Sequence, residues 1–206
     1  FAFKNTNSRV YSRKLNDDFE ETWGQRCGVK LGAAELRTII PSQEDLKKIK
    51  KNPIYIILDS VLDTYNVGGI FRLADAVGAE KVILCGTTET PPSSRIKKAS
   101  INTTEWVTWS YAPTAVDAIH ELKTQNSKLK IIAIEQNEKS IPYEKADYKF
   151  PIGLVVGNET TGVSKEVLEM ADQTVEIPMW GVNKSLNVIV SLGIVLYRVM
   201  ENISDP

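Results

Sequence analysis

The chain has 206 residues, of which 42% are hydrophobic and 25% charged, a composition that excludes collagen-like, coiled-coil and disordered proteins. Twenty-five Lys and Arg residues against 26 Asp and Glu residues give a formal net charge of −1, so the chain as a whole lacks the basic character that most simply predicts nucleic-acid binding. No apolar run approaches the roughly 20 residues that a transmembrane helix needs, so we expect no membrane partner.

Cysteine and histidine are too sparse for several kinds of site. Cys27 and Cys85 lie far apart and have no metal-ligand spacing, so we expect neither a metal nor a disulfide framework, and we predict a reducing, cytoplasmic location. His120 lies in an amphipathic run (AVDAIHELK), where a solvated or half-buried structural role is favoured over catalysis.

Residues 1–52 are predicted to form a basic N-terminal extension that is partly helical. They hold 11 Lys and Arg residues against 7 Asp and Glu residues, and Pro41-Ser42-Gln43-Glu44 is a helix-start signal before the run DLKKIKK. Residues 53–206 are acidic, with 14 basic against 19 acidic residues. We expect them to form the principal domain.

After Pro53, short β-branched runs alternate with helical stretches. The expected strands are 54–58, 81–85, 129–134, 153–156 and 174–178, and the expected helices are 69–79, 114–123, 165–171 and about 186–202. Almost continuously apolar strands are typical of a parallel sheet covered on both faces. We therefore predict an α/β fold, a mostly parallel sheet flanked by helices, with its ligand site at the carboxyl ends of the strands.

The loop after the first expected strand reads LDSVLDTYNVGGIFRLADAVGAE. Asn66 is expected to cap the helix, Gly68 and Gly69 to permit close approach of a backbone or ligand, and Gly78 to end the helix. Arg72 stands among apolar residues near the helix start. It either extends into solvent, which is favoured for an isolated arginine, or meets an anion.

The second loop, GLVVGNETTGVS, carries Gly157 and Gly162 at a phosphate-loop spacing. Val163 occupies the place of the phosphate-binding lysine, and Glu159 would repel a polyphosphate. A turn with Asn158 and Glu159 suits a neutral or cationic ligand with hydroxyls. A polar strand-to-helix turn without a ligand is the alternative.

In the third loop a strand is expected to end at Ile177-Pro178-Met179, followed by a turn over 180–184. Ser185 is predicted to cap the last helix, with Asn187 in its first turn and its amide directed back toward the loop. Gly193, inside this apolar helix, is expected to pack closely on another backbone, since glycine costs about 1 kcal/mol there relative to alanine.

Together the three loops resemble the SpoU/TrmH class of the SPOUT RNA methyltransferases. The motif N-x-G-x-x-x-R is matched by Asn66, Gly68 and Arg72; the G-N-E turn followed by glycine by Gly157-Asn158-Glu159 and Gly162; and I-P-M-x-G followed by S-L-N by Ile177-Pro178-Met179, Gly181 and Ser185-Leu186-Asn187. The resemblance covers residues 53–202. Ile189 departs from it, because the family commonly has a small residue there.

The resemblance implies a SPOUT-like domain with a C-terminal trefoil knot, S-adenosylmethionine as cofactor, and a homodimer. It implies methyl transfer to the ribose 2′-hydroxyl of tRNA or rRNA. The catalytic set that it gives is Arg72, Asn66, Glu159 and Asn187. The cofactor pocket that it gives is Gly157, Asn158, Ile177, Met179, Ser185 and Leu186, with Glu135 as a further wall.

Because arginine stays protonated, Arg72 is expected to grip an RNA phosphate and stabilise the incipient alkoxide rather than to accept a proton. Arg95, Lys97 and Lys98 beside the turn at 90–94 are predicted to contact RNA phosphates, with a solvated surface loop as an equal alternative. The aromatic residues of the run 104–111 (TEWVTWSY) alternate as in a strand, so packing is favoured over stacking on bases.

Two other functions stay open from the sequence. An inactive relative would bind RNA or S-adenosylmethionine without turnover, although the presence of all four catalytic candidates favours activity. A phosphate-loop nucleotide hydrolase is disfavoured by Val163.

Overall fold

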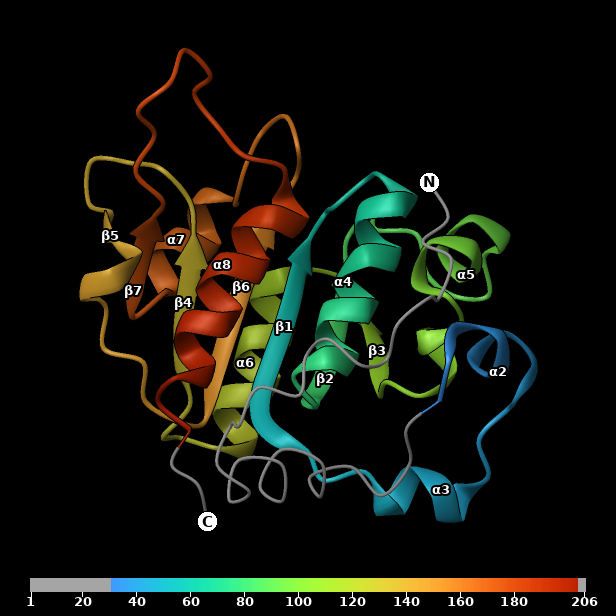
Figure 1. Cartoon of the computed structure of the whole chain (residues 1–206). Helices are drawn as coiled ribbons and strands as arrows, with labels where there is room; N and C mark the ends of the chain where they lie inside the picture. Colours follow the sequence, from blue (N-terminus) through green and yellow to red (C-terminus); the bar gives the residue numbers. More distant parts are fainter. Residues whose placement is uncertain (1–30, 204–206) are drawn as a thin grey trace, which may run out of the picture.

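The computed structural model describes residues 31–203 and shows seven strands in one sheet, with helices on both faces (Figure 1). The strand order is β3-β2-β1-β6-β4-β7-β5, and every neighbouring pair is parallel. The predicted α/β architecture is therefore confirmed. The carboxyl ends of all the strands lie along the same edge of the sheet.

All five expected strands are present within about two residues of their predicted bounds. They are β1 (Asn52–Asp59), β2 (Ala79–Cys85), β4 (Lys130–Ile134), β6 (Ile152–Gly157) and β7 (Gln173–Glu176). Two more strands, β3 (Trp109–Ala112) and β5 (Ile141–Pro142), form the two edges of the sheet. β3 overlaps the end of the run 104–111, whose aromatic residues alternate as in a strand, whereas β5 has only two residues and no such pattern.

The helices of the described region divide between the two faces of the sheet. They are α2 (Ala33–Thr38), α3 (Gln43–Lys48), α4 (Thr64–Ala76), α5 (Ser94–Ser100), α6 (Ala115–Gln125), α7 (Lys165–Met170) and α8 (Val188–Met200), with short 3₁₀ turns η1 (Thr103–Glu105) and η2 (Tyr143–Lys145). One core cluster packs α4, α5 and α8 on the sheet, and the other packs α6 and α7 on the opposite face.

The central strand β1 shows why both faces are buried. Ile56 and Leu58 belong to the core under α4 and α8, whereas Ile57 between them belongs to the core under α6. Side chains of a strand alternate between faces, so a strand with helices on both sides must be apolar at every position. This explains the continuous run IYIIL in the sequence.

The ends of two helices differ from the predictions. Asp63, not Asn66, caps α4, and its side chain accepts a hydrogen bond from the Tyr65 N–H. Asn187, not Ser185, caps α8 and accepts from the Ile189 N–H. In both cases a polar residue three or fewer positions away was equally suited to the cap, and the path of the chain decided between them.

The glycines behave in two ways. Gly78 follows the last residues of α4 with a φ of +59° and donates to the Asp75 carbonyl, so its predicted role at the helix end is confirmed. Gly193 does not pack on another backbone: a Cβ there would meet Leu73 side-chain carbons at 3.7 Å, an ordinary contact. The predicted close packing on another backbone is therefore not found among the described residues of the single chain.

Residues 31–52 lie against the domain through specific hydrogen bonds. Ser42 caps α3 as predicted. The buried Asn102 donates from Nδ2 to the Leu36 carbonyl over 2.9 Å, and Lys51 donates to Thr108. Residues 1–30 of the predicted extension lie outside the described residues. Among the helices that are described, none has the length and apolar character needed to cross a membrane.

Candidate active site

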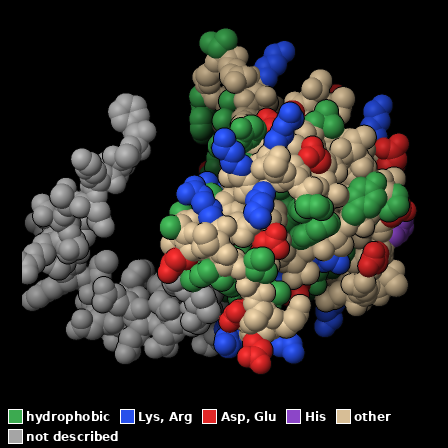
Figure 2. All heavy atoms as spheres, turned by 90° about the vertical axis from the view of Figure 1, so that its right-hand side faces the viewer, with side chains coloured by type: hydrophobic (Ala, Val, Ile, Leu, Met, Phe, Trp, Pro, Cys, Tyr) green, Lys and Arg blue, Asp and Glu red, His purple; other side chains and the backbone are tan. Residues whose placement is uncertain are grey.

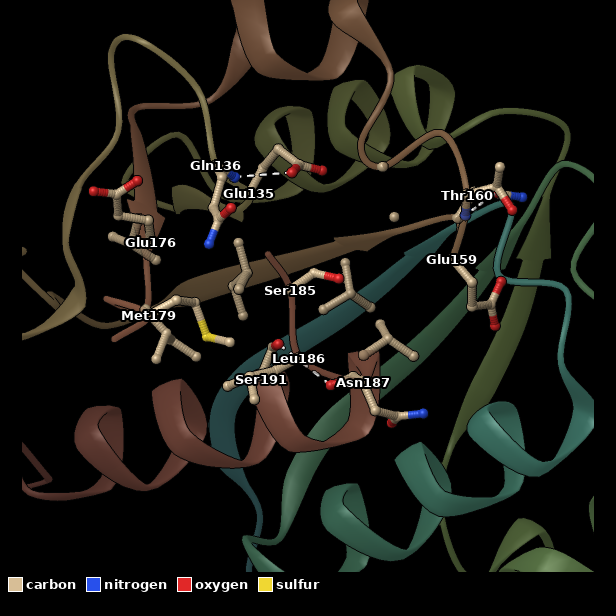
Figure 3. Close-up of a pocket in the computed structure, with 18 of the residues that line it drawn as sticks. Glu135, Gln136, Glu159, Thr160, Glu176, Met179, Ser185, Leu186, Asn187 and Ser191 are labelled. Carbon is tan, nitrogen blue, oxygen red and sulfur yellow. Dashed lines mark hydrogen bonds between the residues drawn. The ribbon is translucent and has the colours of Figure 1, made fainter. Parts of the chain in front are cut away.

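The second and third loops singled out in the sequence line a cavity of about 480 Å³ at the carboxyl edge of the sheet, and hydrogen bonds join the first loop to them. The cavity lies beyond the ends of β4, β6 and β7 and reaches the start of α8. In Figure 3, Glu135 and Glu176 lie toward one end of it and Glu159 toward the other, with Ser185 and Leu186 between them. A cavity of this volume is in the range of small-molecule and cofactor sites.

A chain of side-chain hydrogen bonds connects the three loops. The Asn187 Oδ1 atom accepts from the Ile189 N–H as the cap of α8, so its Nδ2 group faces Asn66 and donates to Oδ1 over 3.1 Å. The Nδ2 group of Asn66 then donates to Glu159 Oε1 over 2.7 Å. Because each amide must present its donor and acceptor to opposite partners, the chain fixes the orientation of both asparagines.

Glu159 also holds the loop that follows β1. Its two carboxylate oxygens accept from the Leu62 and Asp63 N–H groups, each over 3.0 Å. Partial burial acts to raise the pKa of Glu159, but the hydrogen bonds from Leu62, Asn66 and nearby backbone N–H groups outweigh it and hold the pKa below its ordinary value. The carboxylate is therefore charged at neutral pH and orders the loop of the first motif.

The second motif forms a compact turn. A Cβ at Gly157 would stand 2.2 Å from the Gly162 carbonyl carbon and the Val163 nitrogen. Asn158 closes the turn by donating to the Ser60 carbonyl and by accepting from the N–H groups that follow it. The glycine spacing thus allows two backbone segments to pass close to each other inside the turn.

Glu135, directly after strand β4, holds this turn in place by a hydrogen bond. Its Oε2 atom accepts from the Val163 N–H over 2.8 Å. The same atom lies 2.1 Å from where a Cβ at Gly162 would stand, and Gly162 has a φ of +72°. Glu135 therefore supports the cavity wall as well as lining it.

Asp59, at the carboxyl end of β1, was not predicted. It is buried, and its Oδ2 atom accepts both from the Ser164 N–H over 2.8 Å and from the Ser164 Oγ over 2.7 Å. These bonds join the first motif loop to the start of α7. A carboxylate placed directly after a buried parallel strand was the available signal.

The structure brings most of the predicted site residues together. All of the predicted cofactor residues line the cavity, namely Glu135, Gly157, Asn158, Ile177, Met179, Ser185 and Leu186. Glu159 and Asn187 line it too, whereas Asn66 contacts it through them.

Arg72 lies apart from this group. Its side chain is exposed on α4, does not line the cavity, and forms no ion pair with the described residues. Arg95, Lys97 and Lys98 are exposed on α5, on the far side of α4 from α8 (Figure 1).

The lining of the cavity is acidic. It includes the carboxylates of Glu135, Glu159 and Glu176, and no Lys or Arg occurs among its described residues. Such a lining disfavours a polyphosphate and favours a ligand that carries positive charge. A parallel sheet with this acidic, glycine-framed cavity at its carboxyl edge, beside the Glu159–Asn66–Asn187 chain, defines an α/β protein with a site for a small-molecule ligand.

Comparison with known proteins agrees with the geometry. The chain belongs to the SpoU rRNA Methylase family, whose model matches residues 53–197. A tRNA (guanosine(18)-2′-O)-methyltransferase of Aquifex aeolicus is 35% identical over 162 residues, which are 76% of this chain and 72% of that protein. The enzyme of the same description from Escherichia coli is 33% identical over 146 residues, 69% of this chain and 61% of its own length.

Solved structures share the fold. An AdoMet-bound rRNA methyltransferase from Sinorhizobium meliloti superposes with a TM-score of 0.66 at 29% identity, covering 82% of this chain and 60% of that one. The chain therefore spans about 60% to 72% of the length of these relatives.

Proposed function

We propose that the protein transfers a methyl group from S-adenosylmethionine to the ribose 2′-hydroxyl of an RNA, either a tRNA or an rRNA. The observation that carries the proposal is the hydrogen-bonded chain Glu159–Asn66–Asn187, which joins all three motifs at one cavity. Relatives described as tRNA and rRNA 2′-O-methyltransferases support it.

The residues present suit this cofactor. Ile177, Met179 and Leu186 offer apolar contact for an adenosyl group, and the acidic lining suits a cationic sulfonium. Gly157 and Ser185 would hold the cofactor with backbone and hydroxyl groups. When bound, S-adenosylmethionine supplies an electrophilic methyl group.

The chain's own residues then position the nucleophile. A 2′-hydroxyl is a weak nucleophile, so the site must hold its oxygen in line and stabilise the negative charge that develops on it. Asn66 and Asn187 orient the loops around the cavity, and the charged Glu159 keeps them in place. We assign to Arg72 the binding of an RNA phosphate and the stabilisation of the incipient alkoxide, as a permanently charged group.

We also propose that the protein acts as a homodimer. The exposed faces of the adjoining helices α4 and α8 carry large apolar side chains, with Tyr65 58%, Val190 48% and Tyr197 55% exposed, next to Leu62 at 55%. An apolar surface across two helices is typical of a protein interface. Arg72 lies on the same helix as Tyr65, two turns further along, so a second copy docked here would bring Arg72 beside an interface.

Further parts of the proposal rest on sequence. We propose a trefoil knot formed by the segment that leads from β7 into α8, a cytoplasmic location, phosphate contacts by Arg95, Lys97 and Lys98, and an RNA-binding extension over residues 1–52. Family membership supports the knot, and the exposure of the three cations on α5 supports the RNA contacts.

The central test is methyl transfer from tritiated S-adenosylmethionine to total RNA of a deletion strain, followed by mapping of the modified nucleotide. We expect Arg72→Ala to abolish transfer and to leave cofactor affinity unchanged, with Lys128→Ala as the control for loss of an exposed cation. Wild-type turnover in Arg72→Ala would refute its role. Cofactor binding without label in any RNA would favour a binding protein without turnover.

A further inference from the structure

A second cavity, of about 400 Å³, lies outside the site described above. It is enclosed by the turn before α5, by η1 and by the edge strand β3, and its lining includes Pro92, Lys97, Glu105 and Trp109. Figure 2 looks onto the side of the molecule where α5 and α2 lie, and Lys and Arg side chains are spread across this face. The cavity is large enough for one nucleotide.

Two charged side chains, Lys97 and Glu105, line this cavity, and Arg95 and Lys98 lie on the same helix as Lys97. Arg95, Lys97 and Lys98 are exposed on α5, and none of them forms an ion pair within residues 31–203. Glu105 on η1 is exposed and likewise has no ion pair there. Three unpaired cations on one short helix are suited to successive phosphates of a nucleic acid.

The wall of the cavity is suited to a base. Trp109 is half-buried, packed on the core by part of its side chain while also lining the cavity. Aromatic rings held in this way stack on unpaired bases. The Glu105 carboxylate can only accept hydrogen bonds, so it favours a base that presents N–H donors, but it would repel a phosphate.

Helix α5, which borders this cavity, packs closely on α4, the helix that carries Asn66 and Arg72. A Cβ at Gly68 would stand 2.9 Å from the Ile96 carbonyl oxygen and the Ser100 nitrogen of α5 and 2.5 Å from the Ala99 Cβ. Gly68, which lies between Asn66 and Arg72 on α4, therefore lets α5 pack directly against this part of α4. The distance between Arg72 on α4 and the cavity beside α5 is therefore fixed, so one RNA molecule can contact both.

We propose that this cavity binds one unpaired nucleotide of the RNA, with its base on Trp109 and Glu105 and its phosphate on Lys97. The proposal rests on the proposed function and adds a second nucleotide-binding site to it. Arg95 and Lys98 then contact the neighbouring phosphates.

The test measures the affinity of the full chain for unfractionated bacterial tRNA and rRNA by filter binding over a range of salt concentrations. Glu105→Ala separates base recognition from simple charge, because removing a negative charge near phosphates tightens binding, whereas losing a contact to a base weakens it. We expect weaker binding. Glu169→Ala, an exposed carboxylate on α7, is the matched control and should leave affinity unchanged.

Two further variants test the other contacts. Lys97→Ala should reduce the slope of log affinity against log salt by about one, the change for a single phosphate contact, whereas Lys128→Ala should not. Trp109→Leu should weaken binding by about 5- to 150-fold, the range for one stacked base, and Trp109→Phe should restore most of it. Thermal melting verifies that Trp109→Leu is folded. If it is not folded, the RNA affinity of Glu105→Ala decides whether the nucleotide site exists.

The outcomes separate this proposal from the proposed function, because RNA binding is measured without methyl transfer. If Glu105→Ala or Trp109→Leu binds RNA as well as or better than the wild type, the nucleotide site is overturned even though methyl transfer persists. If these variants weaken binding but the wild type methylates no RNA, the proposed function fails and the nucleotide site stands.

Discussion

Replacing Gly162 by alanine probes how the turn of the second motif is held. A Cβ at this position would stand 2.1 Å from Glu135 Oε2, so the carboxylate must move and release the Val163 N–H. Losing a hydrogen bond to a charged group costs about 1.5–3 kcal/mol, and placing alanine at a positive φ costs about 1–2 kcal/mol more. We expect Gly162→Ala to lower the free energy of unfolding by about 3–4 kcal/mol.

The double variant makes the reasoning testable. Glu135→Ala alone removes the same hydrogen bond and should cost about 2 kcal/mol. In Gly162→Ala/Glu135→Ala the steric conflict is gone and the bond is lost only once, so the total should equal that of Gly162→Ala alone. The two changes are therefore expected to be non-additive by about 2 kcal/mol.

Urea denaturation of the four proteins measures this coupling, and calorimetry measures their affinity for S-adenosylmethionine. The affinity should fall in all three variants, because the turn lines the cavity. Thr161→Ala, at an exposed position of the same turn that does not line the cavity, is the control and should change neither quantity. Additive costs, with a coupling below about 0.5 kcal/mol, would show that Glu135 does not hold the turn.

Three other predictions concern single groups. The pKa of Glu159 is lowered in the folded protein, so its stabilising effect is complete above the ordinary carboxyl pKa of 4.5 and is lost as the pH falls through the lower folded value. The difference in unfolding free energy between wild type and Glu159→Gln should therefore be constant at neutral pH and shrink below pH 4.5. A difference that stays unchanged down to pH 3 would contradict this. Burial first, with Asp59 and Asp117 adding to it, raises the pKa of the Cys85 thiol to about 12, so iodoacetamide at pH 8 should label the Cys85 peptide only after unfolding, as read by mass spectrometry. Gly193→Ala should stabilise the protein by about 0.5–1 kcal/mol, since its Cβ would meet only an ordinary contact at 3.7 Å; a lower melting temperature would indicate that this face of α8 is more tightly packed than the single chain shows.

Much of the fold followed from local sequence. Strands buried on both faces require continuous apolar runs, so β1, β2, β4 and β6 could be located to within about two residues. The edge strand β3 was indicated only by the strand-like alternation of residues 104–111, and the two-residue strand β5 had no comparable signal. The cap of α3 at Ser42 was predictable because it depends on neighbouring residues alone.

For the candidate site, too, the residues could be predicted from the sequence but their hydrogen-bond partners could not. The motif residues were identified through the resemblance of the three loops to the SpoU/TrmH class, and all of the predicted cofactor residues line one cavity. The partners of these residues were not recognisable. Glu159, for example, holds Asn66 and the backbone after β1, which lie more than 90 positions away in the chain.

The sequence by itself thus determined the class of fold and the edge of the sheet where the site lies, because these depend on short-range patterns of burial and turn formation, and the resemblance of its three motifs to a known family supplied the candidate site residues. Only the tertiary structure decided that Asn66 donates to a carboxylate 93 positions away, that Asn187 caps α8 while reaching Asn66 across 121 positions, and that Arg72 lies exposed beyond the cavity. A hydrogen bond depends on atoms brought within about 3 Å. For residues this far apart in the chain, packing of the sheet and helices sets that distance.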